Sequence, residues 1–87
     1  MKERSISDFE PSMRALLRIM QILLDKPTIG KTALSQEAGI NYTRFLKHLE
    51  WLESKQLAEL SFDNHKVVVR LTNNGREIAL LFLGNQE

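Results

Sequence analysis

Three basic residues in the segment NYTRFLKHLEWL, residues 41–52, are the strongest candidates for chemistry in this chain. Arg44, Lys47 and His48 fall within a window, residues 38–49, that contains no acidic residue. Guanidinium and ammonium groups bind phosphate oxygens and the edges of bases. The segment also has apolar residues at helical spacing, so basic side chains would occupy the outward face of a helix. That face either contacts nucleic acid or is only a solvated surface.

Catalytic and metal-binding chemistry finds little support elsewhere in the sequence. The chain has no cysteine, and its two histidines, His48 and His65, have no further ligand residues at metal-binding spacing. It also lacks a nucleophile elbow and a phosphate-binding loop, and Gly75 in TNNG is better explained by the start of a helix. We therefore expect no enzyme activity, no catalytic residue, no metal, no cofactor and no evident small-molecule ligand.

Size and composition indicate a single small globular domain. A chain of 87 residues buries roughly 60–65% of its unfolded surface in one core, which leaves no room for a separate ligand-binding domain. Hydrophobic residues make up 43% and charged residues 26%, and the net charge is only +1. The total charge therefore does not decide the partner. Because no signal-peptide core or membrane-spanning run is present, we expect a cytoplasmic protein that does not bind a membrane.

Apolar residues at three- and four-residue spacing predict a first helix from Glu10 to about Asp25. Pro11 suits the first helical position, where a missing N–H is no loss, and Pro27 ends the helix. The residues of its buried face are Met13, Leu16, Leu17, Met20, Leu23 and Leu24. The residues of its polar face include Arg14, Arg18, Gln21 and Asp25.

A second, short helix is predicted over residues 31–38 and a third over residues 41–55. Gly39 between them supplies the positive φ of a tight helix end, and Asn41 is a suitable N-cap for the third helix. The side chains along the inward side of the third helix are Phe45, Leu49, Leu52 and Gln56. Its outward side chains are Thr43, Arg44, Lys47, Glu50, Trp51 and Ser54.

After the third helix the apolar period changes to two, which predicts a β-hairpin turning at Asp63-Asn64-His65-Lys66. In its two strands, apolar residues alternate with the remaining residues. The alternating apolar positions are Ala58, Leu60 and Phe62 in the first strand and Val67, Val69 and Leu71 in the second. The residues between them in the second strand are Lys66, Val68 and Arg70.

Short flanking segments complete the predicted organisation. Residues 28–30 are long enough only for a single bridging strand, and Thr72 is a suitable cap for a last helix that ends near Leu83. The predicted parts are an N-terminal arm at residues 1–9, one domain at 10–83 and a C-terminal tail at 84–87.

The order helix, bridge, helix, turn, helix, hairpin, helix resembles the winged helix-turn-helix domain of prokaryotic transcription regulators. LSQEAGINYTRFLKHLEWLESKQLAEL is similar to the second and third helices of that family, and VVVRLTNNGREIAL is similar to its second wing strand and closing helix. The resemblance covers about residues 11–83 and is greatest to the small single-domain regulators common in archaea. It implies a mainly α fold with a small antiparallel hairpin. Gln56 departs from the family, which often has glycine there; a non-glycine in left-handed geometry costs about 1 kcal/mol.

In winged helix-turn-helix proteins the third helix enters the major groove of DNA, with its amino-terminal part nearest the bases. The resemblance therefore implies a recognition helix over residues 41–55, in which Arg44 is the best candidate for a base contact and Lys47 for a base or a phosphate. Further contacts are possible at the start of the second helix and at the wing tip. The implied DNA-binding residues are Tyr42, Thr43, Arg44, Lys47, His48, Lys31, Thr32, His65 and Lys66.

Several of these residues have a second interpretation. Tyr42 lies near the core edge and either packs or contacts DNA, whereas Lys31 and Thr32 either bind a phosphate or only begin a helix. Trp51 lies on the outward stripe, farther from the helix start. It is expected to pack against the arm or a second subunit rather than to touch DNA.

The closing helix is apolar almost all round, so one stripe of it should be covered by something other than its own core. The favoured prediction is a two-fold homodimer through the first and last helices, and the alternative is a monomer that packs this run against the first helix. The predicted dimer-interface residues are Ile78, Leu80, Leu81, Phe82, Leu83 and Trp51.

Together these features predict a transcription regulator that binds double-stranded DNA with sequence specificity. The alternative is a winged-helix module that binds a protein partner through the same face, and RNA is a weaker third possibility. The acid-free basic window distinguishes the first two, because a protein-binding module has no need of it.

Overall fold

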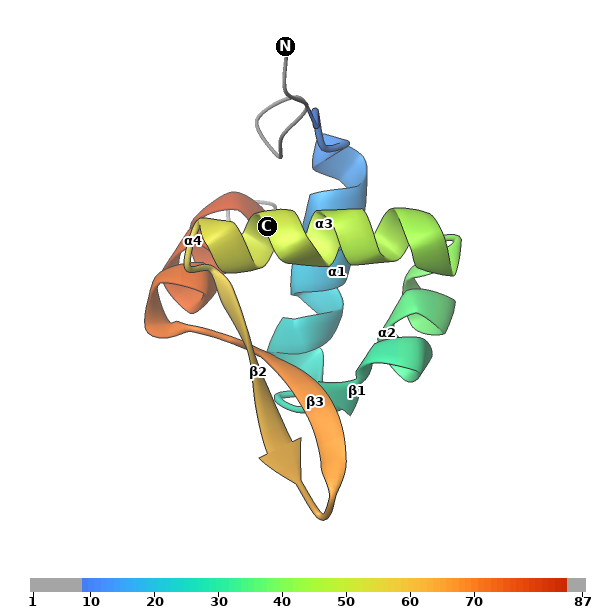
Figure 1. Cartoon of the computed structure of the whole chain (residues 1–87). Helices are drawn as coiled ribbons and strands as arrows, with labels where there is room; N and C mark the ends of the chain where they lie inside the picture. Colours follow the sequence, from blue (N-terminus) through green and yellow to red (C-terminus); the bar gives the residue numbers. More distant parts are fainter. Residues whose placement is uncertain (1–8, 85–87) are drawn as a thin grey trace, which may run out of the picture.

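The structure is a computed structural model that describes residues 9–84. Its elements are α1 (Met13–Asp25), β1 (Ile29–Gly30), α2 (Lys31–Ala38), α3 (Tyr42–Ser54), β2 (Ala58–Asp63), β3 (Lys66–Leu71) and α4 (Asn73–Leu83). Figure 1 shows α3 packed across α1, with α2 beside them and the β2–β3 hairpin extending away from the helices as a wing. The predicted element order and the mainly α fold class are confirmed. The predicted arm and tail lie almost wholly outside the described residues.

The first helix begins later than the sequence pattern predicts. Its N-cap is Ser12, whose Oγ accepts the backbone N–H of Ala15 at 3.2 Å, so the helix starts at Met13 rather than at Glu10. A serine oxygen that accepts one of the free N–H groups of a first helical turn stabilises the start there. Pro11 therefore precedes the cap instead of occupying the first turn. The predicted end at Asp25 is confirmed.

The turn between α2 and α3 forms as predicted. Gly39 has a φ of 70°, the left-handed conformation that ends α2. The Oδ1 atom of Asn41 accepts the backbone N–H groups of Thr43 and Arg44 at 2.9 and 3.3 Å, which caps α3. In addition, Nε of Arg18 in α1 donates to the carbonyl oxygen of Ala38 at 2.8 Å. This bond ties the turn to α1.

The sheet has three antiparallel strands in the order β1-β3-β2, so the predicted bridging strand is present. Val69 pairs with Ile29 on one side and Leu60 on the other, and its side chain is fully buried at the centre of the sheet. The hairpin turns at Asn64 and His65, both with positive φ (54° and 64°). Two such residues between paired strands are typical of a type I′ turn, whose twist matches that of the strands.

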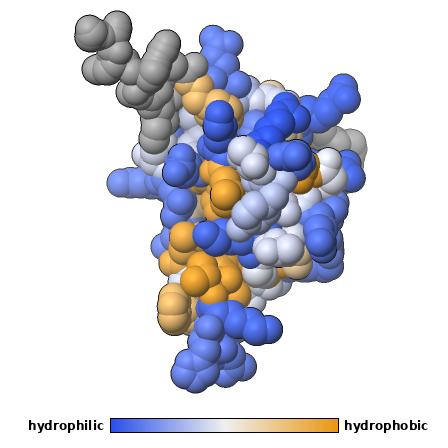
Figure 2. Space-filling model, turned by 45° about the vertical axis from the view of Figure 1, so that its right-hand side comes forward, coloured by the Kyte–Doolittle hydropathy of each residue, from blue (hydrophilic) through white to orange (hydrophobic). Residues whose placement is uncertain are grey.

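The period-two pattern predicts correctly which residues of the hairpin are buried only in the part that lies near the helices. Ala58 is buried, but Leu60 is 37% exposed and Phe62 is 77% exposed, because the hairpin extends beyond the helical layer. Figure 2 shows apolar side chains gathered just above the hydrophilic tip of the wing. Val68 is also buried, although it alternates with the exposed Lys66 and Arg70. Its partner in β1 is Gly30.

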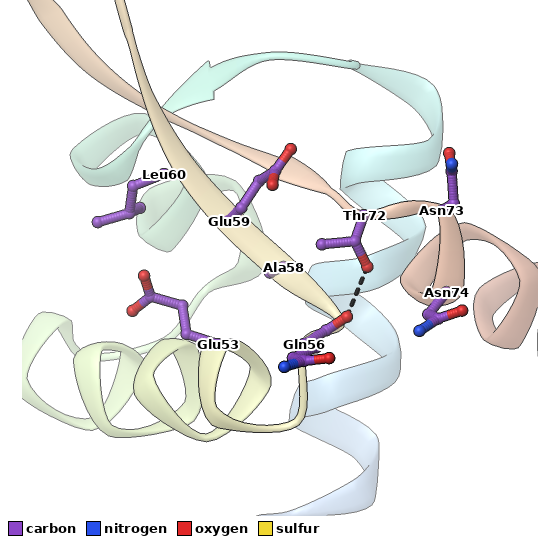
Figure 3. A pocket seen from close by; sticks show the side chains of 8 residues that line it. All are labelled: Glu53, Gln56, Ala58, Glu59, Leu60, Thr72, Asn73 and Asn74. Atoms are coloured by element: carbon purple, nitrogen blue, oxygen red, sulfur yellow. Dashed lines mark hydrogen bonds between the residues drawn. The ribbon is translucent and has the colours of Figure 1, made fainter.

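The end of α3 and the start of α4 are joined by one hydroxyl group. Gln56 has a φ of 61°, so this position does need left-handed geometry without a glycine. Its carbonyl oxygen accepts a hydrogen bond from Oγ1 of Thr72 at 2.6 Å (Figure 3). The same Oγ1 accepts the backbone N–H of Gly75 at 2.9 Å and so caps α4, as predicted.

A single hydrophobic core joins all four helices and the sheet. Its largest fully buried apolar side chains are those of Ile19, Leu23, Leu34, Phe45, Leu52 and Val69. Because this core anchors the inner face of α3 along its length, the outer face of α3 is held in a fixed orientation.

Candidate nucleic-acid interface

The first two turns of α3 present an exposed polar surface. The side chains of Thr43, Arg44 and Lys47 are all exposed, whereas Phe45 and Leu49 on the opposite side are buried. No carboxylate lies in this part of the helix. The predicted division of α3 into an inner apolar face and an outer basic face is therefore present in its amino-terminal half.

Tyr42 has the first of its two predicted roles, packing, and its contact with DNA stays a prediction. Its ring stacks on Phe45 with the centroids 6.0 Å apart, yet 42% of the residue is exposed. Packing therefore fixes the ring at the edge of the core, while its hydroxyl end remains free to donate or accept a hydrogen bond from a partner.

His48 does not lie on the outer face, which corrects the prediction that it flanks the DNA surface. It is 1% exposed, and its Nε2 accepts the backbone N–H of Ser12 at 3.0 Å. Because Nε2 is the acceptor, the proton of the neutral ring lies on Nδ1, which donates to the carbonyl oxygen of Arg44 at 2.9 Å. The edge of Phe9 packs on the ring at a centroid distance of 5.0 Å. His48 therefore fastens α3 to the start of α1.

Trp51 is half-buried and packs on the hydrophobic core, with Nζ of Lys55 5.5 Å from the centre of its ring. The predicted arm lies almost wholly outside the described residues, and its last residue, Phe9, contacts His48. The burial of Trp51 comes from the core of its own domain. Its predicted packing against the arm or a second subunit stays a prediction.

The charge on α3 changes sign along the helix. Arg44 and Lys47 occupy its first two turns, whereas Glu50 and Glu53 occupy its last two. Figure 3 shows Glu53 and Glu59 among the side chains that line a hollow of about 590 Å³ between the end of α3, β2 and the start of α4. Carboxylates repel the phosphates of nucleic acid. A nucleic-acid surface on α3 is therefore restricted to its amino-terminal half.

The remaining predicted contact residues come from two other elements. Lys31 and Thr32 begin α2, whose N-cap, Gly30, makes no side-chain capping bond, so N–H groups of this turn are available to a ligand. His65 and Lys66 are exposed at the wing tip, where Lys66 pairs across the hairpin with Asp63. The sheet register places Gly30 beside Val68 of β3, so the start of α2 lies next to the base of the wing.

The predicted dimer residues divide into two groups. Ile78, Leu83 and Trp51 are partly buried against the core. Leu80, Leu81 and Phe82 of α4 remain 52%, 59% and 49% exposed. Packing of α4 on α1 within one chain therefore covers only one side of the apolar run.

Two residues outside the sequence candidates also reach the basic end of α3. Arg14 and Arg18 of α1 line a hollow of about 420 Å³ together with Arg44 and residues of the turn. The sequence assigned both only to the polar face of their helix. Their four-residue spacing was the available signal, but it did not indicate which element they would face.

The described part of the chain, residues 9–84, contains no helix that is long and apolar enough to cross a bilayer. Within the same residues no group of three or more histidine, aspartate or glutamate side chains could hold a metal ion.

Comparison with known proteins finds likeness in structure. No protein-family model and no curated protein matches the chain. Among solved structures, the chain is similar to SPO1453 from Silicibacter pomeroyi, a MarR family transcriptional regulator, with a TM-score of 0.75 and 22% identity over 83% of this chain and 52% of the other. It is also similar to the transcriptional regulator PcaV from Streptomyces coelicolor, with a TM-score of 0.73 and 14% identity over 90% of this chain and 65% of the other.

A third similar structure contains nucleic acid. The transcriptional repressor CouR, bound to a 23-mer DNA duplex, matches with a TM-score of 0.71 and 20% identity over 78% of this chain and 50% of its own. These likenesses confirm the winged helix-turn-helix fold. The chain spans about half the length of SPO1453 and CouR. The predicted closeness to archaeal regulators remains a prediction.

Proposed function

We propose that this winged helix-turn-helix domain is a cytoplasmic transcription regulator that binds double-stranded DNA, with the first two turns of α3 in the major groove. One observation carries the proposal: Thr43, Arg44 and Lys47 form an exposed, acid-free face at the amino-terminal end of α3. This is the part of the recognition helix that contacts bases in helix-turn-helix proteins. The DNA-bound CouR structure supports it by likeness of fold.

The proposed contacts differ in what they contribute. Arg44 carries a forked guanidinium that matches O6 and N7 of guanine, and Thr43 and Lys47 can bond bases or phosphates. Lys31 and Thr32 would hold a phosphate at the start of α2, and His65 and Lys66 would touch the backbone from the wing. Base contacts give specificity, and phosphate contacts give affinity and register.

Binding to random duplex at rising salt tests the proposal. Each phosphate that the protein neutralises lowers the slope of log affinity against log salt by about 0.9. We expect measurable binding at about 50 mM salt that weakens steeply toward 200 mM. Absence of binding at the lower salt would contradict DNA binding by this domain.

Two single variants separate base reading from backbone contact. We expect Arg44→Ala to lose preference at one base pair, by about 1–3 kcal/mol, because a bidentate base contact is removed. Lys66→Ala should weaken all duplexes alike, since a phosphate contact carries no sequence information. A target duplex is first selected from random DNA with the wild-type domain. Competition between this duplex and its single-base-pair variants then measures both effects. Equal losses on every duplex for both variants would show that Arg44 does not read a base.

We further propose a homodimer through the exposed side of α4. Leu80, Leu81 and Phe82 are about half exposed on a helix whose other side is buried. Exposed apolar side chains that adjoin on one helix are typical of a protein interface. A two-fold dimer would present two α3 helices to half-sites separated by roughly one turn of DNA, about 34–36 Å, which implies a pseudo-palindromic target.

The molar mass measured by light scattering, at protein concentrations of tens of micromolar, tests the proposed dimer. The wild-type chain should have the mass of two copies, and Leu81→Glu should have the mass of one, because a carboxylate is costly to bury in an apolar interface. Phe62→Glu, which makes the same kind of change at an exposed apolar residue on the wing, is the matched control and should remain dimeric. A monomeric wild-type chain counts against the interface.

The wing also favours one alternative function. Phe62 is 77% exposed and Leu60 is 37% exposed on the same strand, and contact with a DNA backbone has no need of this apolar surface. A winged-helix module that binds a protein partner would use this apolar surface. That function becomes the better one if duplex binding is absent.

A further inference from the structure

A cluster of three arginines lies between α1 and the turn that leads into α3. Arg14 and Arg18 from α1 and Arg44 from α3 line one hollow of about 420 Å³, together with Ser12 and the residues of the turn. The cluster joins the proposed DNA face to a helix that lies outside the helix-turn-helix unit.

The local structure explains why these side chains converge. Arg14 and Arg18 are four residues apart on α1 and so share one face of it. Arg44 lies in the first turn of α3, where a helical side chain leans back toward the amino terminus and therefore over the turn. Nε of Arg18 is held by the carbonyl oxygen of Ala38 at 2.8 Å, which leaves its two terminal nitrogens as donors.

The charges of the cluster favour an anion. Three arginines line this one hollow, so like charges gather there, and the amino-terminal end of α3 adds a partial positive charge. Among residues 9–84 the ion pairs are Lys26–Glu37 and Arg70–Glu59, and neither involves this cluster. The forked N–H donors of arginine can bond two oxygens of a phosphate or a carboxylate group at once.

We propose that this hollow binds a phosphate group, and that Arg14 and Arg18 are its ligands from α1. The inference rests on the proposed function, because the phosphate group is a backbone phosphate of the DNA whose major groove α3 enters. The same donors would also take a free phosphate, so the two sources are separated by experiment. Arg44 borders both this hollow and the base-reading face.

The test compares Arg14→Gln with Arg76→Gln. Both variants remove one exposed arginine from a helix and change the net charge equally, but Arg76 lies on α4, beside the opposite end of α3. Arg14 is chosen over Arg18 because loss of the bond to Ala38 could alter the turn itself. The wild-type chain and both variants are titrated with random duplex between 50 and 200 mM salt, and their thermal unfolding is followed in inorganic phosphate and in chloride of equal ionic strength.

We expect Arg14→Gln to make the slope of log affinity against log salt less steep by about 0.9. Its loss of affinity relative to the wild type then becomes about threefold smaller between 50 and 200 mM salt. Arg76→Gln should keep the wild-type slope. A slope change confined to Arg14→Gln supports a DNA phosphate. Specific stabilisation by inorganic phosphate that Arg14→Gln alone loses supports a free phosphate. If Arg14→Gln and Arg76→Gln behave alike in both measurements, the site is refuted while DNA binding stands. If the wild type binds no duplex, the proposed function fails. Thermal unfolding in inorganic phosphate then decides alone whether the hollow binds a phosphate group.

Discussion

Gly75→Ala is expected to lower the free energy of unfolding by about 3 kcal/mol, at the upper end of the range for overpacking. A Cβ atom at this position would lie 1.8 Å from the carbonyl oxygen of Leu57 and 2.8 Å from its carbonyl carbon. Both neighbours are backbone atoms, and the oxygen already accepts the N–H of Thr72 at 3.1 Å. The side chain can therefore be accommodated only if α4 moves away from the start of the hairpin.

Thermal unfolding measures this effect directly. For a domain of this size a loss of 3 kcal/mol corresponds to a fall in the midpoint on the order of 12–24 °C. Gly84→Ala is the matched control, because it makes the same change at the other end of α4, where a Cβ meets nothing within 4 Å and φ is −71°. The control should leave the midpoint unchanged or raise it slightly. Equal midpoints for both variants would disprove the close approach of α4 to Leu57.

His48→Ala is expected to cost about 2–3 kcal/mol of stability, through lost packing and a donor left without an acceptor. The ring fills a buried space against Phe9, and Nε2 is the acceptor for the N–H of Ser12, the cap residue of α1. Without the ring, the start of α1 and the second turn of α3 lose their connection.

A second substitution separates these two contributions in urea unfolding. His48→Phe keeps an aromatic ring but has no acceptor, so it should still cost about 1–3 kcal/mol, the penalty for an unsatisfied donor. His65→Ala, at the exposed histidine of the wing tip, should change stability by no more than about 0.5 kcal/mol. If His48→Phe is as stable as the wild type, the bond to Ser12 contributes nothing, and the role of His48 is packing alone.

Local signals in the sequence were sufficient for the order of the elements and for most of their ends. Asn41 and Thr72 cap helices, and Gly39 ends one, because each acts on backbone groups within three residues of itself. The left-handed geometry at Gln56 was indicated only by the resemblance, because winged helix-turn-helix proteins often have glycine at that position. Even the start of α1 was missed only because two local signals, Pro11 and Ser12, compete.

Contacts between distant parts of the chain were not predictable. On the periodicity of α3, His48 falls at the border of the two faces, and only the packing of Phe9 and Ser12 against it reveals that it is interior. In the same way, TNNG placed Gly75 correctly at a helix start but gave no sign of Leu57. The arginine cluster depends on how α1 and α3 cross, which no spacing within either helix specifies.

The reversal of charge along α3 has a consequence for approach as well as for contact. A helix with Arg44 and Lys47 at one end and Glu50 and Glu53 at the other is an electric dipole at the surface of a nearly neutral chain. In the field of a polyanion such a dipole experiences a torque even where the net force is small. We therefore expect the domain to turn the amino-terminal end of α3 toward DNA before the two surfaces meet. Most encounters in which the carboxyl-terminal end of α3 faces the DNA should then dissociate before any base is contacted.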